Sequence, residues 1–137
     1  MARHLPNDQR VVDEVFSMTA KAKHNGWLMG MVATFGRTPE ELQGFSWNDD
    51  HSINIRANKR PLRPLHPQWV LLFQLKEKQP SRMESRWSVL SSSLIDALAD
   101  DKCHVSLDGL IFSYKVRKIY YTSLKRQKRM TEYPVAC

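Results

Sequence analysis

Cysteine is scarce in this chain of 137 residues, where Cys103 and Cys137 are the two that occur. They provide no disulfide framework and no C-x-x-C motif, so a reducing, intracellular setting fits best. The five histidines stand apart and lack the spacing of a metal site. We therefore expect no metal and no small-molecule cofactor.

Long apolar runs and an acidic excess are also missing. No apolar run approaches the roughly 20 residues of a membrane span, and the N-terminus has no signal-peptide core. Lysine and arginine outnumber aspartate and glutamate by 21 to 14, which gives a net charge of +7. A chain this basic favours polyanionic partners, with nucleic acid ahead of an acidic membrane surface. We expect a soluble, cytoplasmic protein with no membrane association.

Apolar residues are plentiful, at 42% of the chain with four tryptophans and five phenylalanines. This content predicts a single folded domain over residues 1–137. Apolar periodicity predicts helices over residues 9–23, 27–35, 66–75 and 85–99, with Phe16, Leu72 and Ile95 among the core side chains. A short helix should begin at Thr38, and His24-Asn25-Gly26 should stop the first helix.

Residues 51–63 change to a period of two. Ile53 and Ile55 alternate with polar residues, which indicates a strand, and residues 59–64 form a second extended piece restricted to an edge by two prolines. We expect a small hairpin with a basic rim of Arg56, Lys59, Arg60 and Arg63. The predicted fold class is therefore mainly α with a small antiparallel β-hairpin or sheet (α+β).

The most basic stretch covers residues 112–129, with no acidic residue between Asp108 and Glu132. Val116, Ile119, Tyr120 and Leu124 recur in it at the spacing of one helix face. We expect a helix with this apolar face in the core and its basic face offered to an anion. Its cations are Lys115, Arg117, Lys118, Lys125, Arg126, Lys128 and Arg129.

Several segments together resemble the catalytic core of the tyrosine recombinases, or phage integrases. Residues 31–47 (Met-Val-Ala-Thr-Phe-Gly-Arg-Thr-Pro-Glu-Glu-Leu-Gln-Gly-Phe-Ser-Trp) are similar to the family's first arginine box, T-G-L-R-x-x-E followed by a tryptophan. Residues 53–64 resemble its lysine-bearing hairpin, and residues 66–75 resemble the helix after it. Residues 112–121 match the H-x-x-R box by position. The resemblance spans residues 5–126 and is closest to integrase-like proteins of cyanobacteria and their phages.

The resemblance implies Arg37 as the first catalytic arginine, Lys59 as the acid/base lysine and Arg117 as the second arginine. Preorganised arginine and lysine donors stabilise a phosphoryl transition state more than its ground state. The basic hairpin and helix are expected to add DNA contacts. These are Arg56, Arg60, Arg63, Lys115, Lys118, Lys125, Arg126, Lys128 and Arg129.

The chain departs from the family pattern at several points. Gly36 directly precedes Arg37 where the family has G-L-R, Tyr114 stands in the place of the first histidine, and Lys118 stands where a histidine often follows the arginine. The family's G-H box and nucleophilic tyrosine lie about 30 residues after the second arginine. Here 20 residues follow Arg117, and Tyr133 is too close to it for that spacing.

These features predict a double-stranded DNA-binding protein related to site-specific tyrosine recombinases, degenerate or truncated, without strand cleavage as the chain stands. It would belong to a bacterial or phage mobile element and associate with the nucleoid when bound to DNA. Two alternatives stay open. The chain is a fragment of an active integrase whose missing C-terminal part supplies the tyrosine, or it is a non-catalytic module that regulates a recombinase by contacting other protomers.

Overall fold

The computed structural model describes residues 7–99 and 105–132, without the side chains of residues 128–132. The described helices are α1 (Asp8–Lys21), α2 (Lys23–Phe35), α3 (Pro39–Leu42), α4 (Pro67–Leu72), α5 (Met83–Leu98) and α6 (Leu107–Glu132). Two short strands, β1 (Ser46–Trp47) and β2 (Ile53–Asn54), pair antiparallel. The predicted fold class, mainly α with a small antiparallel sheet, is confirmed.

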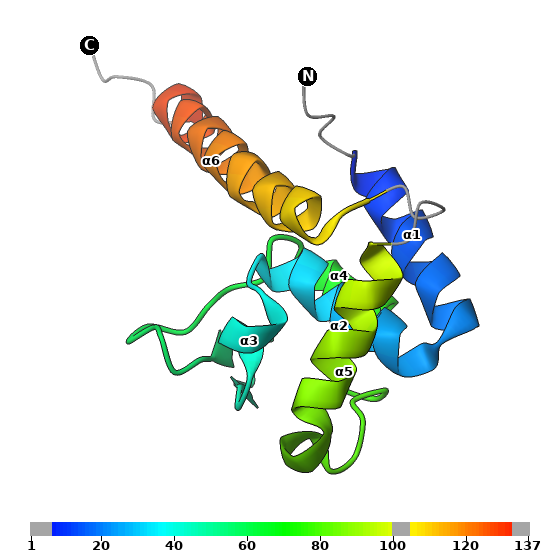
Figure 1. Ribbon diagram of the computed structural model, residues 1–137. Helices are drawn as coiled ribbons and strands as arrows, with labels where there is room; N and C mark the ends of the chain where they lie inside the picture. The colour runs from blue at the N-terminus through cyan, green and yellow to red at the C-terminus, as the bar shows by residue number, and fades with distance from the viewer. Residues whose placement is uncertain (1–6, 100–104, 133–137) are drawn as a thin grey trace.

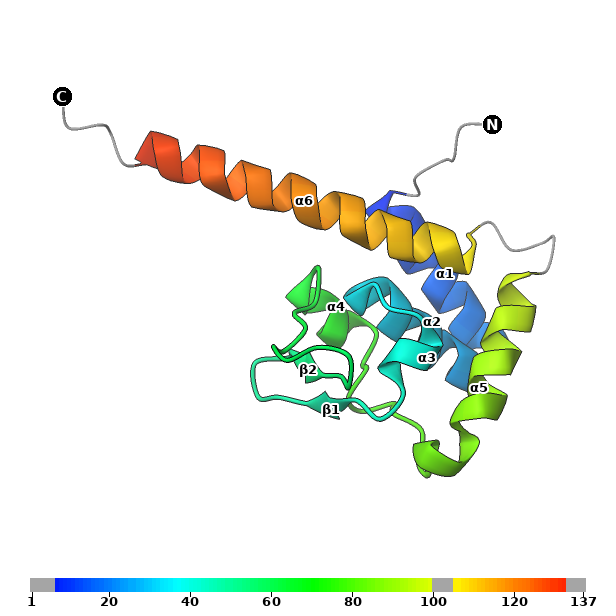
Figure 2. The same cartoon turned by 60° about the vertical axis from the view of Figure 1, so that its left-hand side comes forward.

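Helix α2 forms the centre of the molecule. It is buried from Asn25 to Phe35, as expected for a helix that is apolar on every side. Helices α1, α5 and α6 all pack against it, and α6 lies across the rest of the body (Figure 1, Figure 2). Buried side chains from each described helix join one hydrophobic core.

The junction between α1 and α2 differs from the prediction. His24-Asn25-Gly26 does not stop the first helix, because these residues form the first turn of α2. The break lies at Ala22, whose backbone is extended with φ −153° and ψ 102°. Gly26 serves packing instead, because a Cβ there would overlap the backbone of Thr19 in α1. Glycine thus lets the two helices approach closely.

Tryptophan side chains connect α2 to the short elements around it. Trp27 packs beside Phe45 and Trp87, with ring centroids 6.1 and 6.2 Å away. The indole N–H of Trp27 donates to the Leu75 carbonyl at 2.7 Å, and that of Trp87 donates to the Pro39 carbonyl at 2.8 Å. Both of these buried indole N–H groups therefore have an acceptor, as burial requires.

The predicted hairpin is only partly correct. Strand β2 pairs with β1, which precedes it, and not with a second strand over residues 59–64. That segment contributes one antiparallel bridge, in which Ile53 and Leu62 exchange backbone hydrogen bonds of 3.0 and 2.7 Å. Pro61 and Pro64 lie on either side and have no N–H with which to extend the ladder.

Three side chains predicted to lie in the core are exposed instead. Phe16, Leu72 and Ile95 are 43%, 45% and 47% exposed. In two cases the preceding residue takes the buried position, since Val15 and Leu94 are 1% and 0% exposed. Val15 and Leu94 belong to the predicted stripes as well, so the buried stripes of these helices are correct in position but narrower than predicted.

Helix α6 contacts the body through a different face from the one predicted. Ile119, Tyr120 and Leu124 are 70%, 58% and 42% exposed, so their predicted burial is wrong. The buried residues of this helix are Leu110, Ser113 and Tyr114. The second half of α6 extends past the body (Figure 2). We call the outward apolar residues the α6 outer stripe: Phe112, Val116, Ile119, Tyr120 and Leu124.

None of the helices in residues 7–99 and 105–132 combines the length and apolar character that a membrane crossing requires.

Candidate nucleic-acid interface

Tyr114, which the resemblance aligns with a histidine, joins three parts of the molecule. It is 2% exposed, and its hydroxyl donates to the Arg63 carbonyl at 2.9 Å. Its ring rests against Gly36 at the end of α2, and the Lys118 ammonium lies 5.6 Å from the ring centroid. Burial raises the pKa of the phenol, while the nearby Arg37 charge lowers it by a smaller amount. Tyr114 therefore fastens α6 to the end of α2.

Gly36 and Tyr114 depart from the recombinase pattern as a pair. Gly36 caps α2 in the left-handed region, with φ 66° and ψ 32°, and its N–H donates to the Val32 carbonyl. A Cβ at position 36 would overlap the Tyr114 ring. A large ring at 114 therefore requires a residue without a side chain at 36, and the left-handed backbone favours the same residue.

Arg37 follows this cap and lies where α2 meets α3. Its Nη1 donates to the Gly36 carbonyl at 3.3 Å, and its Nε is 4.0 Å from Glu41 Oε2. Glu41 also closes the capping box of α3 with Thr38, as the sequence predicts. The Arg37 side chain is 22% exposed, so part of its guanidinium faces solvent.

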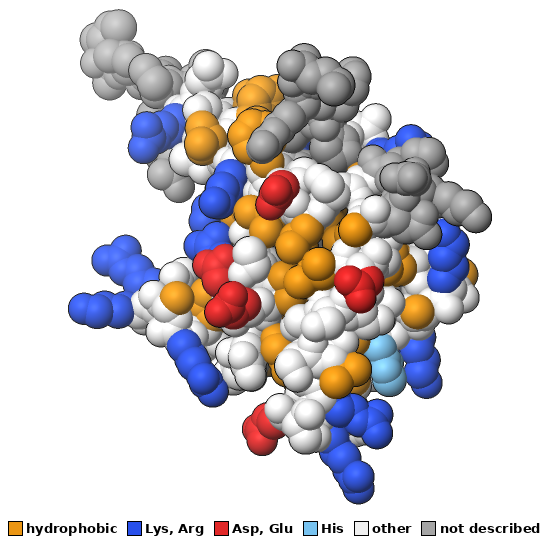
Figure 3. All heavy atoms as spheres, in the orientation of Figure 1, with side chains coloured by type: hydrophobic (Ala, Val, Ile, Leu, Met, Phe, Trp, Pro, Cys, Tyr) orange, Lys and Arg blue, Asp and Glu red, His pale blue; other side chains and the backbone are white. Residues whose placement is uncertain are grey.

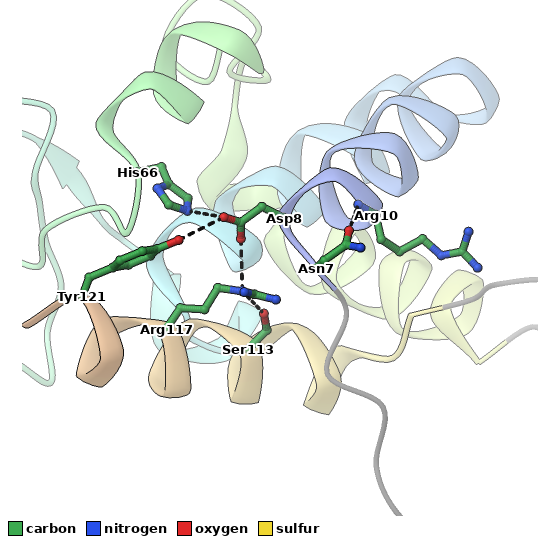
Figure 4. Close-up of polar contacts among 7 residues, drawn as sticks. All are labelled: Asn7, Asp8, Arg10, His66, Ser113, Arg117 and Tyr121. Atoms are coloured by element: carbon green, nitrogen blue, oxygen red, sulfur yellow. Dashed lines mark hydrogen bonds and ion pairs between the residues drawn. The ribbon is translucent and has the colours of Figure 1, made fainter. Parts of the chain in front are cut away.

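Arg117 meets an unexpected partner at the first residue of α1. Its Nε lies 3.1 Å from Asp8 Oδ1. The other carboxylate oxygen, Oδ2, is 3.0 Å from His66 Nε2 and accepts from the Tyr121 hydroxyl at 3.2 Å. We call Asp8, His66, Arg117 and Tyr121 the Asp8 cluster; Figure 4 shows the three partners pointing toward the carboxylate.

The two carboxylate oxygens of Asp8 differ in their hydrogen bonding. The single N–H on Arg117 Nε donates to Ser113 Oγ at 3.1 Å. Oδ1 is buried but accepts no hydrogen bond from the part of the chain that the structure describes. It is held by the charge of the Arg117 guanidinium. Partial burial, followed by the Asp8 carboxylate, raises the pKa of Tyr121.

The remaining predicted cations whose side chains the structure describes are exposed. Arg56, Lys59, Arg60 and Arg63 lie on the segment after β2, which we call the basic loop. Arg63 Nη2 is 4.0 Å from Asp50 Oδ2, and both side chains are largely in solvent. On α6 the exposed cations are Lys115, Lys118, Lys125 and Arg126. Lys128 and Arg129 fall among the undescribed side chains, and Tyr133 lies outside the described residues.

The basic loop and the extended half of α6 lie on one side of the molecule. They occupy the same side in two views turned by 60° (Figure 1, Figure 2). Lysine and arginine side chains lie along this margin in the space-filling view, and others lie along the opposite and lower margins (Figure 3). Within residues 7–99 and 105–132, no group of three His, Cys, Asp or Glu side chains could hold a metal ion.

Two of the three residues given catalytic roles by resemblance lie on neighbouring elements. Tyr114 packs α6, which carries Arg117, against the end of α2, which leads into Arg37. Lys59 is exposed on the basic loop. The joint action of these residues stays a prediction.

Sequence reasoning missed the partners of Arg117. Local patterns suggest that Asp8, like Asn7, could cap the first helix, and that His66 begins the predicted helix over residues 66–75. Tyr121 is 113 positions from the carboxylate to which it donates. No local pattern relates residues so far apart, and only the packing of α6 across the start of α1 brings them together.

Comparison with known proteins gives one partial similarity. The chain is 35% identical over 69 residues to Excisase C of Nostoc sp. (strain PCC 7120 / SAG 25.82 / UTEX 2576). The match covers 42% of this chain and 14% of that protein, so the chain spans about one seventh of its relative. No family model and no solved structure matches. Part of the chain is thus homologous to a protein named as an excisase.

Proposed function

We propose that this chain is a DNA-binding protein of recombination, related to the site-specific tyrosine recombinases and belonging to a mobile element. The observation that carries the proposal is the similarity to Excisase C, a protein named for excision. It agrees with the resemblance of the arginine box, the basic loop and the basic helix to a recombinase core.

The charge distribution supports DNA as the partner. The basic loop and the extended half of α6, which lie on one side of the molecule, both carry exposed cations (Figure 1, Figure 2). The exposed ion pair between Arg63 and Asp50, 4.0 Å apart, contributes little to the stability of the fold, because solvent screens such contacts. Cations on such a surface bind phosphates and release condensed counterions from the duplex.

Within this surface we propose Arg37, Lys59 and Arg117 as the phosphate-binding groups that correspond to the family's catalytic positions. An arginine guanidinium can donate two parallel hydrogen bonds to a phosphate, and a lysine acts as a point charge. Tyr114 positions these groups without touching the phosphate, because its hydroxyl is already committed to the Arg63 carbonyl.

The test is binding of a fluorescently labelled duplex, followed by anisotropy. A non-specific complex of this kind should have a Kd of about 10⁻⁶ to 10⁻⁴ M at physiological salt. Charge reversal at Arg60 and Lys125 together should weaken binding about tenfold or more, since neither side chain can then bind a phosphate. Absence of binding at about 10⁻⁴ M protein would contradict the proposal.

A second function, contact with another recombinase protomer, is favoured by the α6 outer stripe. Ile119 and Tyr120 at its centre are 70% and 58% exposed on a helix that extends past the body. Lys115 and Arg126 flank the stripe on the same helix. A complementary partner surface would be apolar and bordered by acidic side chains.

This second function is tested with purified Excisase C, the protein to which part of the chain is similar, as the partner. Sedimentation of the mixture should show a complex that Ile119→Ser with Tyr120→Ser abolishes. Val89→Ser is the matched control, because Val89 is 71% exposed on α5. Equal loss of the complex in the Ile119→Ser/Tyr120→Ser and Val89→Ser variants would contradict this second function, and so would the absence of any complex with the unmodified chain.

A further inference from the structure

The Asp8 cluster has the composition of an anion site whose occupant belongs to the chain itself. Arg117 and Tyr121 lie one turn apart on α6, and His66 directly precedes α4. The Arg117 guanidinium, the Tyr121 hydroxyl and the His66 imidazole converge on a single carboxylate, with Nε, the hydroxyl and Nε2 at 3.1, 3.2 and 3.0 Å (Figure 4). Arginine, hydroxyl and imidazole groups donate hydrogen bonds to phosphate oxygens as well as to carboxylate oxygens.

The carboxylate fills this site incompletely. Asp8 Oδ1 is enclosed yet accepts no hydrogen bond from the described residues, because the nearest N–H, on Arg117 Nε, donates to Ser113. An enclosed oxygen without a donor lowers the stability of the arrangement. A phosphodiester shares one negative charge between two non-bridging oxygens on a tetrahedral centre and can accept donors from more directions than a planar carboxylate.

The position of Asp8 in the chain also allows its side chain to leave the cluster. Asp8 is the first residue of α1, and its neighbour Asn7 supplies the helix cap by accepting from the Arg10 N–H at 2.7 Å. The Asp8 side chain is 35% exposed, so solvent reaches one edge of the cluster. Asp8 can therefore turn away while the cap of α1 stays in place.

We propose that His66, Arg117 and Tyr121 form a phosphate site that Asp8 occupies in the free protein, and that a backbone phosphate of DNA displaces Asp8. This inference rests on the proposed function, which supplies the phosphate. Asp8 lowers the affinity for DNA, because binding must first release the Arg117 ion pair. Asp8 is a regulatory residue of the DNA surface, and His66 and Tyr121 are phosphate ligands in addition to Arg117.

The experiment compares two neutral variants of α1 by duplex anisotropy. Asp8→Asn removes the competing charge and keeps the side-chain shape, and it should tighten duplex binding about fivefold. Asp13→Asn makes the same change in net charge on the same helix, where Asp13 accepts from Gln9 at 2.8 Å. This control should change the affinity by less than about twofold, as general charge predicts.

Arg117→Ala and Tyr121→Phe are then combined with Asp8→Asn. Each should remove most of the gain from Asp8→Asn. In the chain with Asp8 unchanged, each should alter the affinity for DNA less, because Asp8 already pairs with the Arg117 guanidinium and accepts from the Tyr121 hydroxyl. Equal tightening by Asp8→Asn and Asp13→Asn would overturn the inference. So would a gain that survives Arg117→Ala. Wild-type protein that binds no duplex would instead defeat the proposed function.

Inorganic phosphate tests whether the site binds free phosphate or a phosphate of the DNA backbone. At about 20 mM, phosphate should raise the Tm of Asp8→Asn more than chloride at equal ionic strength, and Arg117→Ala should cancel the difference. Phosphate stabilisation with unchanged duplex affinity would overturn DNA as the source. The same melting curves show whether each variant folds. Should Asp8→Asn melt below the assay temperature, Asp8→Ser provides the same comparison.

Discussion

Gly36 and Tyr114 show how one pair of residues fixes the geometry of the candidate site. The glycine has a left-handed backbone with φ 66°, and the tyrosine ring occupies the space that a side chain at 36 would need. Together they set the distance between α6 and the end of α2, and therefore the placement of Arg37. Two departures from the recombinase pattern that the sequence resembles, Gly36 and Tyr114, thus have one structural cause.

Gly36→Ala should destabilise the protein by about 2–4 kcal/mol, from the left-handed backbone and from overpacking against Tyr114. Urea unfolding measures this loss. The double variant Gly36→Ala/Tyr114→Ala should be less destabilised than the sum of the single variants, because removal of the ring relieves the overlap. If the changes in unfolding free energy of the two single variants simply add, Gly36 and Tyr114 do not interact.

Tyr114 also gives a pH dependence with a defined sign. Burial raises the pKa of its phenol in the folded state above the ordinary value of 10.0. The unfolded chain therefore loses this proton first, so the contribution of Tyr114 is complete below about pH 10 and declines as pH rises through the folded-state pKa. The unfolding free energy should fall more steeply above about pH 10 in the wild type than in Tyr114→Phe. Parallel curves would contradict this assignment.

At the scale of the element, α6 shows where periodicity fails as a guide to burial. Its apolar residues at 116, 119, 120 and 124 form a regular stripe, yet the body is contacted by Leu110, Ser113 and Tyr114. The contact face also includes the polar groups of Arg117 and Tyr121, which no hydrophobic pattern would select. A stripe shows that a helix is amphipathic, but it does not show what covers it.

Substitutions on the two faces of α6 should differ sharply in cost. Leu110→Ala, at 1% exposure, should destabilise the protein by about 2–5 kcal/mol, whereas Ile119→Ser, at 70% exposure, should change stability by less than about 0.5 kcal/mol. Denaturant titrations of both variants give the comparison. A cost above about 1.5 kcal/mol for Ile119→Ser would mean that the stripe is packed in solution.

The exposed cations of α6 give a further prediction. Lys118→Ala with Lys125→Ala should reduce the steepness of the log–log dependence of DNA affinity on salt by up to about 1.8, because each phosphate that a lysine neutralises contributes about 0.9. Lys21→Ala with Lys23→Ala is the matched control, because it removes the same charge at the junction of α1 and α2. An equal reduction in both pairs would indicate attraction by net charge alone.

Over the whole molecule, sequence predicts the elements better than their contacts. The buried helix of residues 27–35, the capping box at Thr38 and the long basic helix follow from local patterns, which act within a few residues. The break at Ala22 has no local signal, since the residues around it favour helix, and packing of α1 on α2 decides it. The pairing of β2 with β1 and the partners of Arg117 likewise depend on residues brought together by the fold.

The central claim is that this surface binds DNA through its phosphates, and salt tests it most directly. Duplex affinity should be measured by anisotropy across a series of potassium chloride concentrations. We predict a log–log slope steeper than about −3, which corresponds to at least three or four neutralised phosphates. A slope near zero would contradict the claim, because phosphate contacts by Lys and Arg cannot form without releasing counterions.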